Sequence, residues 1–120
     1  MRINYEALVI EHLNALDFDA YADVPDGKLI PKPSEFVTVE QTGGRTDGVA
    51  LGTVTMAVQS WAASRFEASE LAAKVDAAMF ALVNNENPVT NVSRSSIYNF
   101  PTSQNEPRYQ GVYELAVHLF

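Results

Sequence analysis

Hydrophobic residues follow two different periods along this chain, and each period predicts its own kind of element. Spacings of three and four residues, typical of an amphipathic helix, occur over residues 3–16 and about 64–83. A two-residue alternation is typical of a strand with one buried face, and it predicts strands over residues 19–24, 35–41, 49–61, 91–100 and 108–120. The predicted order is therefore α-β-β-β-α-β-β.

The strongest of these patterns joins a strand directly to a helix start. Val54, Met56 and Val58 alternate with polar or small residues, and Ser64 then begins a Ser-x-x-Glu sequence that ends at Glu67. In such a capping box the serine hydroxyl accepts from the backbone N–H of the glutamate, and the glutamate carboxylate reaches back to the serine N–H. We therefore expect Ser64 to be the N-cap of the second helix.

The segment between the second and third strands is rich in glycine. Residues 42–48 read Thr-Gly-Gly-Arg-Thr-Asp-Gly, which is too long for a tight hairpin turn, so a projecting loop is expected there. Trp61 lies at the following strand–helix junction. We interpret it as a core or hinge aromatic, with an interface anchor as the alternative because tryptophan is enriched at binding hot spots.

The whole chain, residues 1–120, is predicted to form a single α+β domain. Two amphipathic helices pack on an antiparallel or mixed sheet of about five strands, in which residues 91–100 form an edge strand and residues 108–120 a central one. No apolar run approaches the roughly 20 residues of a membrane-spanning helix, and no apolar signal-peptide region is present. We expect its compartment to be the cytoplasm of the cell that makes it.

Composition and charge argue against several classes of function. The chain has no cysteine, which excludes disulfides and thiolate metal sites. Its net charge is −7 and its eight basic residues are scattered, whereas nucleic-acid affinity comes largely from clustered Lys and Arg. Sequence-specific binding of nucleic acid is therefore not expected.

The candidate chemical groups have ordinary structural interpretations. His12 lies within the apolar stripe of the first helix, where a neutral, hydrogen-bonded or partly exposed imidazole is expected, and His118 lies on the polar face of the last strand. Asp17, Asp19 and Asp23 do not continue into a calcium-binding loop. The Gly43-Gly44 pair lacks the Gly-Lys-Ser/Thr of a phosphate-binding loop. We therefore predict no catalytic residues, no metal and no cofactor.

Taken together, the ordered segments resemble the tail terminator, or tail-completion, proteins of long-tailed bacteriophages. An N-terminal amphipathic helix is followed by a short strand and a proline-bearing stretch from Val24-Pro25 to Pro33. The features that follow are a Phe36-Val37-Thr38-Val39 strand with its Gly43-Gly44 loop, a Val58-Gln59-Ser60-Trp61-Ala62 segment, a helix opening with Ala68, Leu71 and Ala72, and Arg108-Tyr109 at the start of the last strand. The resemblance covers essentially the whole chain.

The resemblance implies a structural virion protein with no catalytic site. Proteins of this family form a hexameric ring at the head-proximal end of the tail tube, stop tube growth and offer a surface to the head-completion (stopper) protein. The implied partners are further copies of the chain, the tail tube protein and the stopper, while genomic DNA passes through the ring without specific binding. The hypothesised subunit or tube interface comprises Gly43, Gly44, Arg45, Thr46, Asp47 and Trp61.

Two alternatives remain open at this point. The first is another neck or connector protein, such as the head-completion stopper, or a minor tail protein, because these are also small, acidic and structural. The second is a small cytoplasmic α+β enzyme or ligand-binding domain, for which the sequence contains no intact motif.

Overall fold

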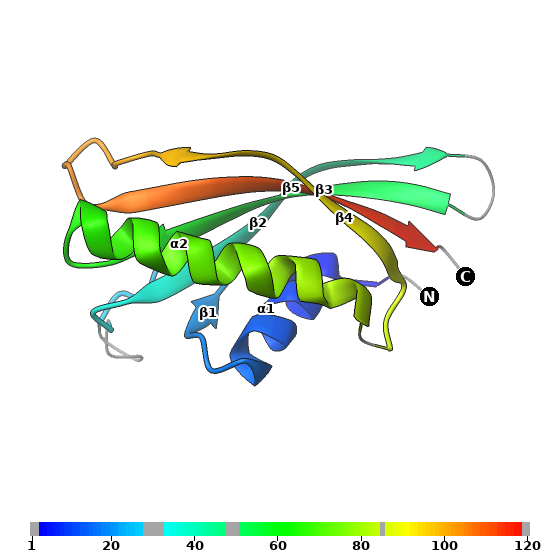
Figure 1. The fold of residues 1–120 in the computed structure, drawn as a ribbon, viewed down its shortest axis with the longest axis horizontal. Helices are drawn as coiled ribbons and strands as arrows, with labels where there is room; N and C mark the ends of the chain where they lie inside the picture. The colour runs from blue at the N-terminus through cyan, green and yellow to red at the C-terminus, as the bar shows by residue number, and fades with distance from the viewer. Residues whose placement is uncertain (1–2, 28–32, 48–50, 85, 119–120) are drawn as a thin grey trace.

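The computed structural model describes residues 3–27, 33–47, 51–84 and 86–118. Its elements, in chain order, are α1 (Tyr5–Ala15), β1 (Ala20–Tyr21), β2 (Phe36–Asp47), β3 (Leu51–Trp61), α2 (Arg65–Phe80), the 3-10 helix η1 (Ala81–Asn84), β4 (Val89–Asn99) and β5 (Arg108–His118). Figure 1 shows one twisted sheet with both helices on the same face. The predicted α+β class and the order α-β-β-β-α-β-β are confirmed.

The sheet is mixed and has the strand order β1-β2-β3-β5-β4. The β1 strand pairs in parallel with β2, and every other neighbouring pair is antiparallel. The β5 strand lies between β3 and β4, which confirms the predicted central strand, and β4 forms one edge of the sheet. The first strand is shorter than the predicted 19–24 and contains two residues.

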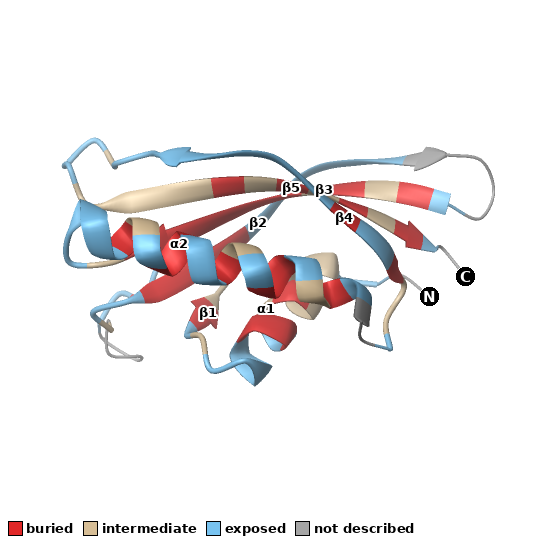
Figure 2. Cartoon of the chain, in the orientation of Figure 1, coloured by how far each residue is buried: buried red, intermediate tan, exposed pale blue. Residues whose placement is uncertain are grey.

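The main hydrophobic core lies between α2 and the middle of the sheet. The β3 residues Val54, Met56 and Val58 are at most 5% exposed, and they belong to one cluster with Val75 and Met79 of α2. Figure 2 shows these buried positions as red bands on the facing sides of α2 and the sheet. Full burial of an aliphatic side chain of this size stabilises a fold by about 1.5–3 kcal/mol. Because the alternating β3 residues are buried against α2, their burial holds α2 on this face of the sheet.

The α1 helix covers the β1–β2 side of the sheet and is tied to α2 by one buried hydrogen bond. Val9 and Leu13 are fully buried, and the neighbouring His12 donates from Nε2 to the carbonyl oxygen of Ala78 over 2.7 Å. The predicted hydrogen-bonded role of His12 is therefore confirmed. Asn14, at the end of α1, brackets β1 by accepting from the N–H of Ala20 and donating to its carbonyl oxygen.

The start of α2 matches the prediction. The Ser64 hydroxyl accepts from the backbone N–H of Glu67 over 3.1 Å, as an N-cap should. At the other end α2 tightens into the 3-10 helix η1, which carries the helical segment to Asn84, close to the predicted end.

Replacing the cap serine should weaken the fold measurably. Ser64→Ala removes the acceptor for the Glu67 N–H, so we expect the free energy of unfolding to fall by roughly 0.5–2 kcal/mol. Urea denaturation followed by circular dichroism measures the change. A midpoint equal to that of the wild type would contradict the assigned cap.

A second change tests the packing of β5 against its own aromatic neighbour. A Cβ added at Gly111 would lie 2.7 Å from Cε2 of Tyr113, which is itself held in the core. We expect Gly111→Ala to destabilise the fold by about 1–3 kcal/mol through overpacking. Gly43→Ala is the control, because its nearest neighbours would be 3.9 Å away, and equal denaturation midpoints for the two variants would contradict this account.

Candidate interaction site

The β2 and β3 strands continue past the helices at one corner of the sheet, where β3 also pairs with Glu114–His118 of β5 (Figure 1). We call Gly43–Asp47 of β2 and Leu51–Thr55 of β3 the arm. The predicted loop over residues 42–48 is wrong for most of its length. Gly43, Gly44, Arg45, Thr46 and Asp47 pair in register with Thr55, Val54, Thr53, Gly52 and Leu51. Only the turn around Gly48 remains for a loop, and it lies outside the described residues.

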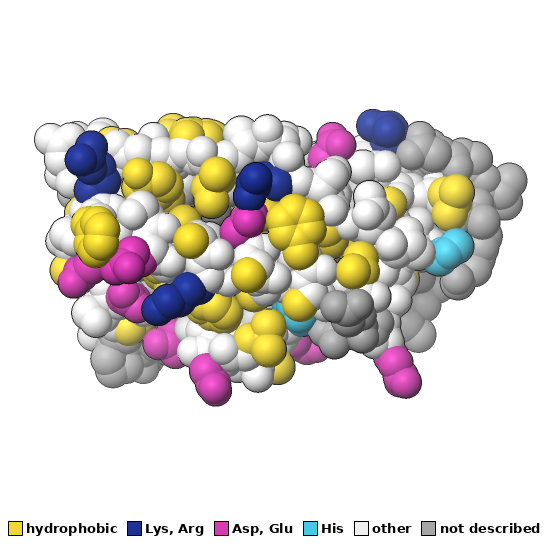
Figure 3. Space-filling model, viewed as in Figure 1, with side chains coloured by type: hydrophobic (Ala, Val, Ile, Leu, Met, Phe, Trp, Pro, Cys, Tyr) yellow, Lys and Arg dark blue, Asp and Glu magenta, His cyan; other side chains and the backbone are white. Residues whose placement is uncertain are grey.

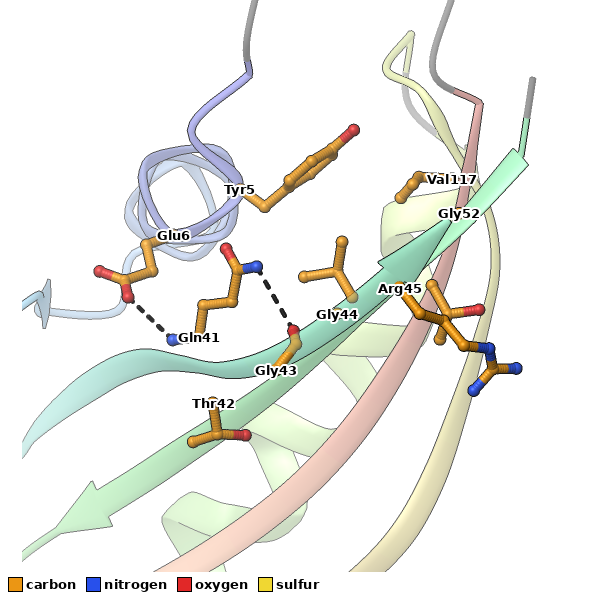
Figure 4. A pocket seen from close by; sticks show the side chains of 11 residues that line it. Tyr5, Glu6, Gln41, Thr42, Gly43, Gly44, Arg45, Gly52 and Val117 are labelled. Carbon is orange, nitrogen blue, oxygen red and sulfur yellow. Dashed lines mark hydrogen bonds between the residues drawn. The ribbon is translucent and has the colours of Figure 1, made fainter. Parts of the chain in front are cut away.

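A bulge at the base of the arm explains why the glycine-rich segment can remain a strand. The register shifts between Gln41 and Gly43, so Thr42 is the extra residue on β2. The backbone N–H of Gln41 donates to the Glu6 carboxylate of α1 over 2.8 Å, and the Gln41 amide donates to the carbonyl oxygen of Gly43 (Figure 4). These bonds hold the base of the arm, because they tie its bulge to the first turn of α1.

A groove of about 610 Å³ lies between the first turn of α1 and the arm. Figure 4 shows the Tyr5 ring on one side of this groove and the glycine-rich strands on the other. Its lining is Tyr5, Glu6, Gln41, Thr42, Gly43, Gly44, Arg45, Gly52, Thr53, Val54 and Val117. A Cβ at Gly44 would lie 3.2 Å from the carbonyl oxygen of Thr53, so glycine lets the two strands and the groove wall approach closely.

Trp61 lies at the opposite end of the same strand pair from the tip of the arm. It is paired with Phe36, the first residue of β2, and their rings stack with centroids 5.2 Å apart. Its indole Nε1 donates to the Thr38 hydroxyl over 3.0 Å, and only 7% of the residue is exposed. The core interpretation of Trp61 is therefore confirmed, and the structure does not bring Trp61 together with the arm.

An aromatic row lies on the sheet face opposite the helices and was not predicted. Arg108 connects its parts, since the guanidinium carbon is 5.0 Å from the Trp61 ring centroid and 4.5 Å from that of Phe100. The members of the row, across the sheet, are Tyr21, Phe36, Trp61, Arg108, Phe100 and Tyr98. In the sequence, aromatic residues alternate near the ends of three strands, and this pattern could have indicated the row. Only the strand order, however, brings these aromatic residues close together.

Beside this row, a chain of polar side chains crosses four strands. The Thr38 hydroxyl donates to the Gln59 amide oxygen and the Gln59 amide donates to Gln110, both over 2.7 Å. The Gln110 amide then donates to the hydroxyl oxygen of Tyr98 on β4. We call these four residues the amide ladder, and it satisfies polar groups that the register places side by side on β2, β3, β5 and β4.

A second polar cluster missed by sequence reasoning lies where α2 meets β4 and β5. The Tyr113 hydroxyl donates to one Asp76 oxygen over 2.9 Å, and Arg94 pairs with the other over 2.6 Å. Burial, followed by the hydrogen bond to the Asp76 carboxylate, raises the pKa of Tyr113 well above its ordinary value. The cluster is structural, because each group has a partner and none faces a cavity described here.

The other candidate groups stay apart in space. His118 is exposed at the end of β5 and His12 is buried between the helices. Asp17 has a positive φ of 71°, which fits the turn after α1. Within residues 3–27, 33–47, 51–84 and 86–118, no three His, Cys, Asp or Glu side chains gather as a metal site. Neither helix in this part of the chain is long and apolar enough to cross a membrane.

Comparison with known proteins does not assign the chain to a family. No protein-family model matches the sequence, and no curated protein matches it in a sequence search. The functional argument therefore rests on the sequence pattern and on the geometry of the arm and groove.

The buried tyrosine predicts a particular response to alkaline pH. The unfolded chain loses the Tyr113 proton near pH 10, whereas the folded protein keeps it to higher pH because its pKa is raised. The free energy of unfolding should therefore fall above pH 10, by about 1.4 kcal/mol per pH unit from this group. In Tyr113→Phe the free energy of unfolding should fall less steeply with pH, by about 1.4 kcal/mol per pH unit above pH 10. Urea titrations from pH 9 to 11 measure both slopes. An equal slope in both proteins would contradict this prediction.

Proposed function

We propose that this protein is a structural subunit of a bacteriophage tail. In this proposal it forms a ring at the head-proximal end of the tail tube, ends tube polymerisation and provides the surface for joining the head. The sequence resemblance suggests this role, and the confirmed element order is compatible with it. The observation that carries the proposal is the exposed glycine-rich segment Gly43–Arg45 of the arm beside an open groove, because a subunit of an assembly needs an accessible element and a place to receive one.

The arm and the groove suggest how neighbouring copies would join. Gly43, Gly44 and Arg45 are exposed, and they line the groove of about 610 Å³ beside them. If the arm of one copy enters a surface of the next, the contact joins two different patches. Such a head-to-tail contact repeats in one direction and closes into a ring when the rotation between copies allows it.

The distribution of charge supports a role around DNA without binding to it. Nine of the fifteen acidic residues lie within residues 1–47, together with four of the eight basic ones, which gives this part a net charge of −5. The remainder has six acidic and four basic residues, a net charge of −2. An acidic ring lumen would repel the DNA backbone and let it pass. The proposed partners are therefore the tail tube protein and the head-completion protein.

Tube assembly in solution tests this proposal. Tail tube protein is allowed to polymerise with and without the purified protein, and tube lengths are measured by electron microscopy. We expect shorter tubes of uniform length, with the added protein at one end only. Tubes of the same length distribution in both samples would overturn the proposal. In purified particles, a label on the portal side of the neck would instead identify a stopper.

Shortening the arm should impair assembly and leave the subunit folded. Gly44 and Val54 are directly paired, so an Asn-Gly turn can replace residues 45–53 between them. We expect the monomer to remain folded by circular dichroism with a lower free energy of unfolding, because Val54 and the residues after it are kept whereas Ala116, Val117 and His118 lose their β3 partners. The variant should fail to limit tube length. Normal tubes with this variant would show that the arm has no role in assembly, and Asn91→Ala, at an exposed position of β4, serves as the control outside the arm.

A further inference from the structure

The α2 helix carries a second apolar face that points away from the sheet. Phe66, Ala73, Ala77 and Phe80 are all exposed, and we call them the α2 stripe. At 3.6 residues per turn these four positions fall within about 60° of the helix circumference, opposite the buried face. Figure 3 shows hydrophobic side chains following the length of α2 on this exposed side.

The two phenylalanines make this stripe unusual for an exposed helix. Phe66 is 69% exposed and Phe80 is 40% exposed, and they mark the first and last turns of α2. A helix that is apolar on opposite faces is normally buried on both of them. The sheet covers one face, so the α2 stripe requires a partner surface.

The spacing of the stripe matches a second copy of itself. Phe66 and Phe80 each lie seven residues from Ala73, on either side of it. In an antiparallel pair of α2 helices centred on Ala73, each Phe66 therefore lies against Phe80 of the other copy, and the small alanines let the helices approach at the centre. Such a self-complementary patch is the property that a two-fold interface requires.

The charges beside the stripe agree with the same arrangement. Glu70 and Lys74 flank the stripe on one side, three residues before and one residue after Ala73. In the antiparallel pair, Glu70 of one copy lies about 3 Å along the axis from Lys74 of the other, and the two-fold axis creates this contact twice. A parallel pair would place like residues opposite each other. On the other flank, Asp76 is already paired with Arg94 within the subunit.

We propose that the free protein forms a two-fold dimer through antiparallel packing of its α2 stripes. This contact joins only two copies and uses the α2 stripe of both, so it differs from the head-to-tail contact of a ring. We expect it in the free protein, before any binding to the tail tube. The inference stands on the α2 stripe alone and does not depend on the proposed tail function. It can therefore be tested without any tube protein.

Introduced cysteines test the pairing directly, because the chain has none of its own. Ala73→Cys places a thiol next to the two-fold axis, so mild oxidation should give a disulfide-linked dimer. Phe66→Cys alone should not cross-link, since two copies of position 66 are about 21 Å apart in this pair. A mixture of Phe66→Cys with Phe80→Cys should cross-link to a mixed dimer. Asn91→Cys, exposed on β4, is the control and should stay monomeric after oxidation.

Analytical ultracentrifugation gives an independent measurement on the protein without cysteines. We expect a dimer whose dissociation constant rises at least tenfold in Phe66→Asp, because the anchor at each end of the interface is lost. Glu70→Lys should weaken the dimer, and the double variant Glu70→Lys, Lys74→Glu should restore it. Circular dichroism establishes that each variant is folded.

Three results would overturn the proposal. One is a wild-type protein that is monomeric at all concentrations tested. Another is a dimer that Phe66→Asp leaves intact. The third is cross-linking of Phe66→Cys with itself in preference to Phe80→Cys, which would indicate a parallel pair or a different partner surface.

Discussion

Burial of one face of β3 beneath α2 is the interaction on which the other elements of this domain depend. Val54, Met56 and Val58 supply the sheet side of the core, and β3 is paired along its whole length with β2 on one side and β5 on the other. The α1 helix joins the same core through Val9 and Leu13, and His12 adds a hydrogen bond to the carbonyl oxygen of Ala78. Loss of the β3–α2 contact would remove the main surface on which α2 packs.

The same strand explains how much of the fold could be predicted. Hydrophobic periodicity is a local property, so it locates β3, α2 and the capped helix start at Ser64 from the sequence alone. The arm was assigned to a loop because glycine is common in turns. Its pairing depends on a continuous partner strand and on the bulge at Thr42, neither of which is visible in the segment itself.

Some residues of the candidate site could be identified from the sequence, but their positions relative to one another could not. Gly43 to Asp47 were identified by composition, and they form the last part of β2, paired with β3, instead of a loop. Trp61 was identified by residue type, yet the antiparallel register places it at the far end of the same strands, stacked on Phe36. The Asp76 cluster joins a helix to two strands far apart in sequence, so only the tertiary structure could reveal it.

The amide ladder has a direction, and Trp61 sets it. An indole N–H can only donate, so the Thr38 oxygen accepts from it, and the Thr38 hydroxyl in turn donates to the Gln59 amide oxygen. Each glutamine amide is then oriented by the one before it, and the last donor reaches the oxygen of Tyr98. A buried indole on β3 therefore lies at the start of a chain of donors that ends at Tyr98 on the edge strand β4, so the polar groups on this face of the sheet are ordered across four strands.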